Sequence, residues 1–160
     1  MTELCFMKEA IKEANKAWKI DEVPIGAVVV YNGKIIARAH NKKETKQNPI
    51  SHAEIEVLQK ASRKLGSWRL EDCDLYVTLE PCPMCAGAIM QARVRHIYYG
   101  AADPKGGAAG TLFNLYDISG FNHYPKVTKG VMAAECGELL TNYFKEKRNH
   151  KKQQNQSATI

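Results

Sequence analysis

Residues 78–85, TLEPCPMC, contain two cysteines, Cys82 and Cys85, separated by two residues. A Cys-x-x-Cys pair can hold a structural metal, form a redox pair or supply two ligands of a catalytic metal site. A closed structural zinc site normally needs four protein ligands, and the sequence has no second Cys-x-x-Cys. The pair on its own therefore leaves the redox and catalytic interpretations open.

A third candidate ligand, His52, lies in the segment SHAEIEVL. His52 begins one helix and the cysteine pair begins another, so two helix N-termini packed on one sheet would bring the three side chains together. Helix N-termini favour negative charge, which suits thiolates. One imidazole and two thiolates leave a tetrahedral position for water, as in catalytic zinc sites. Glu54, two residues after His52, is then placed as a general acid and base rather than as a ligand.

The other cysteines do not suggest a disulfide framework, because the total of five is odd for a chain of 160 residues. We expect Cys5, Cys73 and Cys136 to be small buried apolar residues. The charged N-terminus does not resemble a signal peptide, and no run of about 18 apolar residues could span a membrane. An intracellular, cytoplasmic protein with no membrane association is therefore expected.

Hydrophobic periodicity predicts the elements that position these residues. In chain order it predicts a helix at 2–18, a hairpin turning at Asn32-Gly33, a helix at 52–65 capped by Ser51, a strand at 74–79, a helix at 83–94, a strand at 96–101, a short helix at 111–117, a strand near 126–132 and a helix at 134–147. This order predicts an α/β fold with three α/β/α layers and a five-stranded mixed sheet. Residues 1–150 are expected to form one domain, followed by a disordered polar tail at 151–160.

Positive charge is concentrated near the C-terminus. Residues 145–152, KEKRNHKK, carry a net charge of +4 out of +6 for the whole chain. Such a cluster can be a solvated helix end, where cations complement the helix dipole, or an arm that binds phosphate groups. The composition alone does not decide between them.

The motifs HAE and PCPMC match the H-x-E…P-C-x-x-C signature of zinc-dependent nucleoside and nucleobase deaminases. Residues 1 to about 150 resemble the bacterial tRNA-specific adenosine deaminases, which are part of the cytidine and deoxycytidylate deaminase superfamily. The paired motifs are common to the superfamily, whereas GAADPKGGAAG and FNH point to the tRNA branch.

This resemblance implies a cytidine deaminase-like fold, one zinc ion per subunit and a homodimer. It implies hydrolytic deamination of adenosine to inosine at the wobble position of a tRNA anticodon, with release of ammonia. His52, Cys82 and Cys85 would bind the zinc ion, and Glu54 would transfer protons.

The resemblance also implies contacts with the anticodon stem-loop. Asn41 would hydrogen-bond the flipped base, Ile25 would line its pocket, and the backbone of Ala53 would help to position it. Asp103 would contact the ribose of the neighbouring nucleotide, where a 2′-OH distinguishes RNA from DNA. Further contacts with bases or phosphates are implied for Asn122, His123, Phe144, Lys145, Lys147 and Arg148.

Simpler roles are open for several of these residues. Asn41 could cap a turn, Asp103 could start one, Ile25 and Phe144 could be core residues, and His123 could lie in a surface loop. Two other functions also stay open. A free-base or nucleotide deaminase would use the same metal motif, and a non-catalytic RNA-binding module would need a fourth metal ligand.

Overall fold

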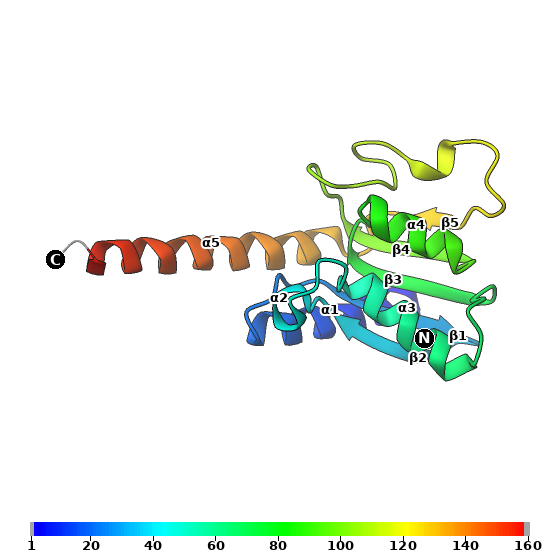
Figure 1. Cartoon of the computed structure of the whole chain (residues 1–160), viewed down its shortest axis with the longest axis horizontal. Coiled ribbons are helices and arrows are strands. Elements are labelled where there is room, and N and C mark those ends of the chain that lie inside the picture. The colour runs from blue at the N-terminus through cyan, green and yellow to red at the C-terminus, as the bar shows by residue number, and fades with distance from the viewer. Residues whose placement is uncertain (1, 159–160) are drawn as a thin grey trace.

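The chain forms a mixed β-sheet covered by helices on both faces, which confirms the predicted fold class (Figure 1). The computed structural model describes residues 2–158. The strand order is β2-β1-β3-β4-β5; β1 runs antiparallel to both of its neighbours, and β3, β4 and β5 are parallel. The strands are β1 (Gly26–Tyr31), β2 (Lys34–His40), β3 (Cys73–Leu79), β4 (His96–Ala101) and β5 (Lys126–Thr128).

The helices enclose a buried cluster on each face of the sheet, with α1 and α5 on one face and α3 and α4 on the other. They are α1 (Glu3–Lys19), α2 (Lys43–Lys46), α3 (Ala53–Leu65), α4 (Pro83–Gln91) and α5 (Ala133–Ala158), with a 3-10 turn, η1, at Leu115–Asp117. Because α4 connects the parallel strands β3 and β4, it begins at the carboxyl end of β3, the edge where ligands bind in open α/β sheets.

Two local features fix the first strands in place. Asn32 and Gly33 both have positive φ, 50° and 73°, as the predicted hairpin turn requires. Gly26 begins β1 directly beneath α1, and a Cβ atom there would lie 2.1 Å from the carbonyl oxygen of Ala10. Any larger residue at this position would push α1 away from the sheet.

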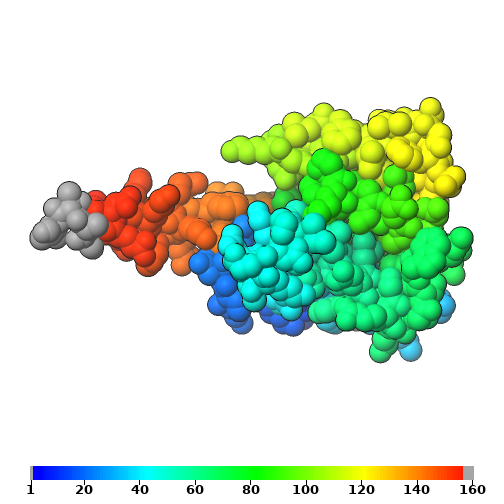
Figure 2. Space-filling view, viewed as in Figure 1, coloured from blue at the N-terminus to red at the C-terminus, as the bar shows by residue number. Residues whose placement is uncertain are grey.

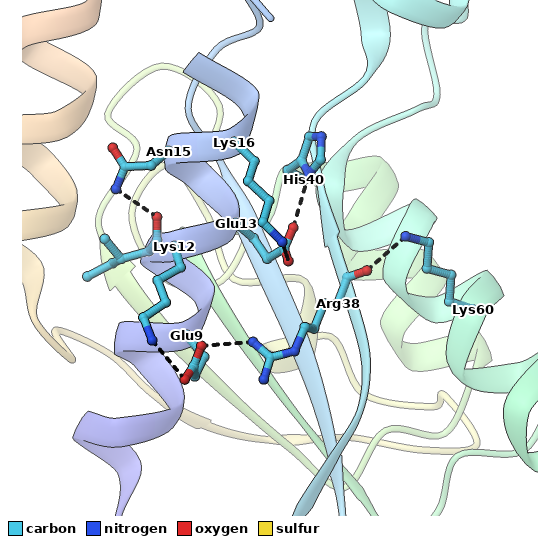
Figure 3. Close-up of polar contacts among 9 residues, drawn as sticks. Glu9, Lys12, Glu13, Asn15, Lys16, Arg38, His40 and Lys60 are labelled. Carbon is cyan, nitrogen blue, oxygen red and sulfur yellow. Dashed lines mark hydrogen bonds and ion pairs between the residues drawn. The ribbon is translucent and has the colours of Figure 1, made fainter. Parts of the chain in front are cut away.

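Polar contacts join α1 and α3 to the edge strand β2 (Figure 3). Glu9 pairs with Arg38 at 2.8 Å, and the buried carboxylate of Glu13 lies 3.0 Å from Nδ1 of His40. Lys60 of α3 donates to the backbone carbonyl of Arg38 at 2.9 Å. These contacts fix the last residues of β2, so the loop that follows starts from a defined point.

The final helix is longer than predicted. The prediction ends the helix at residue 147 and expects a disordered tail, whereas α5 continues to Ala158. Lysine and glutamine are good helix formers, and extending an existing helix needs no new nucleus. Figures 1 and 2 show that the C-terminal part of α5 projects beyond the body of the domain. The expected disorder at residues 159–160 lies outside the described residues.

The buried cysteines were predicted in two of three cases. Cys73 and Cys136 are each 1 % exposed, but the prediction for Cys5 is wrong, because this residue lies on the exposed side of the first turn of α1. Among the described residues, none of the helices is long and apolar enough to cross a membrane.

Several element boundaries also differ from the prediction, and the strand predicted near 126–132 ends at Thr128. The N-cap of α3 is His52 rather than Ser51, because His52 has the extended backbone that precedes the first helical residue. α4 ends at Gln91, before the positive φ of Arg93 interrupts the helical backbone. The helix predicted at 111–117 is reduced to the 3-10 turn η1.

Candidate functional site

Three metal-ligating side chains meet where α3 and α4 begin. His52 is the N-cap residue of α3, Cys82 is the N-cap residue of α4, and Cys85 lies in the first turn of α4. Nδ1 of His52 is 3.7 Å from Sγ of Cys82 and 3.5 Å from Sγ of Cys85. The His52 side chain makes no capping hydrogen bond to α3, so it is available as a ligand.

These spacings fit a tetrahedral metal ion. Zinc–sulfur distances of about 2.3 Å and zinc–nitrogen distances of about 2.0–2.1 Å place neighbouring N and S ligands about 3.6 Å apart at tetrahedral angles. The two observed N–S distances lie on either side of this value. Within residues 2–158, the group contains three ligands and no fourth. A bound metal ion would therefore keep one coordination position open.

The pKa values of the three ligand side chains are shifted in different directions. The hydrogen bond from Cys85 lowers the pKa of the Cys82 thiol to about 4, against the effect of burial and with a further contribution from His52. The same contact and burial raise the pKa of Cys85, and the hydrogen bond to Cys82 raises the pKa of His52. A thiolate attracts a cation, and metal binding would displace the protons that this group binds.

Glu54 places a buried carboxyl group beside the three ligands. It lies in the first turn of α3 and is 4 % exposed, and burial raises its pKa to about 7. Glu56, two residues later, is equally buried but pairs with Lys46 at 2.8 Å. Although burial opposes it, this pairing lowers the pKa of Glu56. Of these two carboxyl groups, Glu54 is therefore the one suited to accept and return a proton near neutral pH.

Asn41 follows directly after the last residue of β2. Its backbone N–H donates to Ile25, its side-chain amide donates to the carbonyl of Val23 at 3.4 Å, and its Oδ1 accepts from the N–H of Lys43 at 3.2 Å. Asn41 therefore does cap a turn. An amide has two donors and two acceptor sites, so these contacts leave capacity for a ligand. Ala53 is fully buried at the start of α3.

The loop between Asn41 and His52 is held by Glu22, which was not among the residues predicted from the sequence. The carboxylate of Glu22 is 1 % exposed and accepts hydrogen bonds from the backbone N–H groups of Glu44 and Thr45, at 3.0 and 2.7 Å. Although burial opposes it, these bonds lower the pKa of Glu22. A carboxylate at the start of the short helix α2 therefore fixes the segment that connects two candidate site residues.

Asp103 stabilises a turn and also lines a surface pocket. Its Oδ1 accepts hydrogen bonds from the backbone N–H groups of Lys105 and Gly106, at 3.0 and 3.1 Å. Asp103 and Phe144 line a pocket of about 760 Å³ between the Gly-rich loop and α5. Figure 2 shows the hollow between this yellow-green loop and the orange start of α5. Phe144 is 41 % exposed, so the alternative core role does not apply to it.

The cations of α5 have different surroundings. Lys145 and Arg148 are exposed, and Arg148 also lines the pocket beside the Gly-rich loop. Lys147 turns toward the end of α1, where its Nζ is 3.4 Å from the hydroxyl of Tyr143 and 3.7 Å from the carboxylate of Asp21. Lys145 and Arg148 are therefore the better placed to meet an external anion.

Asn122 and His123 are not brought to the ligand group within one chain. Nε2 of His123 lies 2.7 Å from the carbonyl oxygen of Val94, and Asn122 lies beside Arg93. Both neighbours follow the C-terminal end of α4, whereas the cysteine ligands lie at its N-terminal end. Any contact between these two residues and a substrate at this site would have to be made by a second copy or far from the ligands.

Two further residues near the site were missed by sequence reasoning. Tyr116 of η1 donates its hydroxyl hydrogen to the carbonyl of Ala86 in α4 at 2.9 Å, which anchors the loop over the cysteine-bearing helix. Glu80, between β3 and Cys82, is 2 % exposed and accepts hydrogen bonds from the Gly-rich loop. The sequence does carry a signal for Glu80, because a charged residue directly after a buried strand is unusual.

Comparison with known proteins identifies the family. The model of the MafB19-like deaminase family matches residues 1–148. A tRNA-specific adenosine deaminase from Bacillus subtilis (strain 168) is 58 % identical over 147 residues, which cover 92 % of this chain and 91 % of that relative. This chain belongs to the tRNA-specific adenosine deaminase family.

Solved structures agree with this membership. A structure from a study of A-to-I editing by tRNA:A34 deaminases at the wobble position of transfer RNA is 46 % identical to this chain, with a TM-score of 0.80. The match covers 85 % of this chain and 99 % of the chain in that structure. The structure of guanine deaminase from Bacillus subtilis is 31 % identical, with a TM-score of 0.63, and covers 93 % and 95 %. The deaminase therefore shares its fold with enzymes that differ in substrate.

We predict that the deaminase binds one metal ion per chain and that Cys85→Ser loses it, because two protein ligands hold a metal ion much more weakly than three. Elemental analysis of the purified protein would measure the metal content. Cys73→Ser is the matched control, since Cys73 is equally buried but belongs to no ligand group among the described residues. Equal metal contents in the two variants would contradict the assignment.

Proposed function

We propose that the chain is a zinc-dependent hydrolase that converts adenosine to inosine at the wobble position of a tRNA anticodon and releases ammonia. The observation that carries the proposal is the meeting of His52, Cys82 and Cys85 beside the buried carboxyl group of Glu54. The 58 % identity to a tRNA-specific adenosine deaminase supports the choice of substrate.

Zinc is the metal that this donor set favours, since one imidazole nitrogen, two cysteine sulfurs and an open position are typical of catalytic zinc sites. His52, Cys82 and Cys85 would hold it. When bound, zinc supplies Lewis acidity that lowers the pKa of a coordinated water molecule to near 7. The positive ends of α3 and α4 face the two thiolates and help to stabilise them.

Glu54 moves the protons of the reaction. Hydrolysis forms a C–O bond at C6 of adenine and breaks the bond from C6 to the exocyclic nitrogen, so protons from water must reach a ring nitrogen and then the departing amine. A single buried carboxyl group can accept the first proton and deliver it to each nitrogen in turn. Glu54 has this position, while Glu56 is held by its ion pair with Lys46.

The surrounding residues would hold the nucleotide. The spare hydrogen-bonding capacity of Asn41 is available to the flipped base, and Ile25 and the backbone of Ala53 would form the walls around it. Asp103 would contact the ribose of the neighbouring nucleotide, and Phe144 would stack on a base in the pocket that both residues line. Asn122 and His123 would reach RNA only from the partner subunit.

Deamination of a free base is the second candidate, favoured by the fold shared with a guanine deaminase. The exposed cations of α5 and the pocket beside the Gly-rich loop, which Arg148 lines, favour a polyanionic substrate instead. A non-catalytic RNA-binding module is not favoured, because it would need a fourth metal ligand and the group found in residues 2–158 has three members. Such a module would also give the buried carboxyl group of Glu54 no role.

We predict that the zinc-loaded protein forms inosine in an anticodon stem-loop RNA and that Glu54→Gln reduces kcat by at least about 10²–10⁴-fold while zinc content is unchanged. Inosine would be measured by nucleoside chromatography, and ammonia release would be followed with free guanine, cytosine and adenosine. Glu56→Gln is the control on the same helix and should keep most of the activity. Turnover of a free base alone, or loss of zinc from Glu54→Gln, would refute the assignment.

The basic part of α5 is proposed as an arm for RNA phosphates. Lys145 and Arg148 are exposed on the helix that borders the pocket, and the helix continues beyond the body of the domain (Figure 2). Lys147 would join them by leaving its weak contacts with Tyr143 and Asp21. Release of counterions from RNA makes such binding depend strongly on salt.

We predict that replacing Lys145 and Arg148 by Gln lowers the slope of log affinity against log salt concentration by about 0.7–0.9 for each phosphate group that is no longer neutralised. Fluorescence anisotropy with a labelled stem-loop RNA would measure it at several salt concentrations. The control replaces Arg63 and Lys64, which lie in a groove between α3 and β2. An identical slope in wild type and the α5 variant would refute the arm.

A homodimer is proposed from the apolar surface between α3 and α4. Ile55, Leu58, Ala88 and Ala92 line an apolar pocket of about 300 Å³ together with Trp68, whose exposed fraction is 57 %. A large exposed tryptophan beside an apolar pocket is typical of a protein interface. Because α3 and α4 also carry the metal ligands, pairing through this surface would bring two sites close together.

We predict that Trp68→Glu weakens dimerisation by at least about 30-fold, the effect of losing about 2 kcal/mol at an interface hot spot. Sedimentation velocity over a range of protein concentrations would measure the monomer fraction. Leu4→Glu is the control, since Leu4 is 54 % exposed on α1, across the sheet from this surface. A monomeric wild-type protein at all concentrations would refute the homodimer.

The proposed catalytic domain is residues 1–150, close to the span matched by the family model. Its site of action is proposed to be the cytoplasm, because its substrate would be tRNA and all five cysteines are free thiols.

A further inference from the structure

Glu80 is a buried carboxylate that is surrounded by one loop. Oε1 accepts hydrogen bonds from the backbone N–H of Asp103 at 3.0 Å and from the hydroxyl of Thr111. Oε2 accepts from the backbone N–H groups of Ala109 at 3.0 Å and Thr111 at 3.1 Å. All four donors belong to the Gly-rich segment 102–111.

No lysine or arginine of residues 2–158 forms an ion pair with Glu80. A buried charge without a counterion is costly unless hydrogen bonds replace its hydration. The loop provides those bonds only when it is folded around the carboxylate. The conformation of the loop therefore depends on the Glu80 carboxyl group, which holds the loop through these hydrogen bonds.

The loop fits around Glu80 without spare room. A Cβ atom at Gly107 would lie 2.4 Å from the carboxyl carbon of Glu80, so a larger residue there would displace either the loop or the carboxylate. The N–H of Gly107 donates to the carbonyl of Asp103, and the N–H of Ala108 donates to the carbonyl of Pro81, both at 2.9 Å. Pro81, the residue after Glu80, is thus also bound to the loop.

These contacts connect two parts of the site. Glu80 lies two residues before Cys82, so its backbone belongs to the segment that carries the cysteine ligands. On the other side, it holds the backbone N–H of Asp103, whose own carboxylate is oriented by two N–H groups of the loop. The Glu80 side chain therefore helps to set the position of Asp103 relative to the ligand group.

We propose that Glu80 is a positioning residue for substrate recognition, which places the Asp103 carboxylate so that the ribose next to the target adenosine is recognised while the base lies at the ligand group. The inference rests on the proposed function, because ribose recognition by Asp103 is part of it. If Glu80 only stabilised the fold, replacing it would lower kcat/KM equally for every substrate. A positioning role instead makes the loss depend on the 2′-OH.

The test uses the full-length, zinc-loaded protein and two stem-loop RNAs, one unmodified and one with 2′-deoxyribose at the nucleotides on both sides of the target adenosine. Dissociation constants, KM and kcat are measured for wild type, Glu80→Gln, Asp103→Ala and the double variant. We expect Glu80→Gln to lose at least 10-fold in kcat/KM for the unmodified RNA, mainly through KM, with unchanged zinc content. For the 2′-deoxy RNA the loss should be less than 3-fold.

The double variant should be no worse than the worse single variant, because both changes remove the same interaction. Glu80→Asp, which keeps the charge but shortens the reach, should recover part of the preference for the 2′-OH. Gly107→Ala disturbs the same contact from the loop side and should reproduce the loss of preference. Thr111→Val removes one donor and should give a smaller loss, which provides a test if Glu80→Gln does not fold.

Equal losses for both RNAs in Glu80→Gln and Gly107→Ala, or additive effects in the double variant, would overturn the positioning role. A wild-type protein without a preference for the 2′-OH in binding and turnover would also overturn it. Absence of inosine with every RNA, combined with a 2′-OH preference in binding that Glu80→Gln abolishes, would refute the proposed reaction and leave the positioning role supported.

Discussion

The site of this protein depends on two helices that begin side by side at one edge of the sheet. Each helix contributes ligands at its first residues, so the relative position of α3 and α4 sets the distances between His52, Cys82 and Cys85. The same arrangement directs two positive helix ends at the thiolates and buries Glu54 in the first turn of α3. A shift of either helix would change the distances between the three ligands, the local electrostatics and the environment of Glu54 together.

Buried carboxylates organise the loops around that edge. Glu22 holds the segment between Asn41 and His52, and Glu80 holds the loop that contains Asp103; each does so through backbone N–H groups. Ordering a loop costs conformational entropy, and charge-assisted hydrogen bonds help to offset it. The chain thus uses three glutamates near its site in different ways: two are bonded to loops, and Glu54 is left able to exchange a proton.

Sequence patterns predicted the mixed sheet and the three side chains that meet as candidate metal ligands, because these depend on periodicity and on motifs of a few residues. The prediction failed where distant contacts or helix extension decide the outcome. The length of α5, the exposure of Cys5 and the 3-10 turn in place of a helix at 111–117 are examples. The location of His123, against Val94 beyond the far end of α4, likewise depends on packing between segments remote in sequence.

The sequence by itself determined which chemical groups are present and that several of them begin helices, since His52, Glu54, Cys82 and Cys85 are recognisable from local spacing. It also determined the concentration of positive charge in the final helix. The tertiary structure alone decided that Glu54 is buried without an ion pair to any described residue while Glu56 has one, and that Glu80 is enclosed by the Gly-rich loop. The reason is physical: burial and hydrogen-bond partners arise between segments that are remote in sequence or on different elements, and local periodicity carries no information about which of them meet.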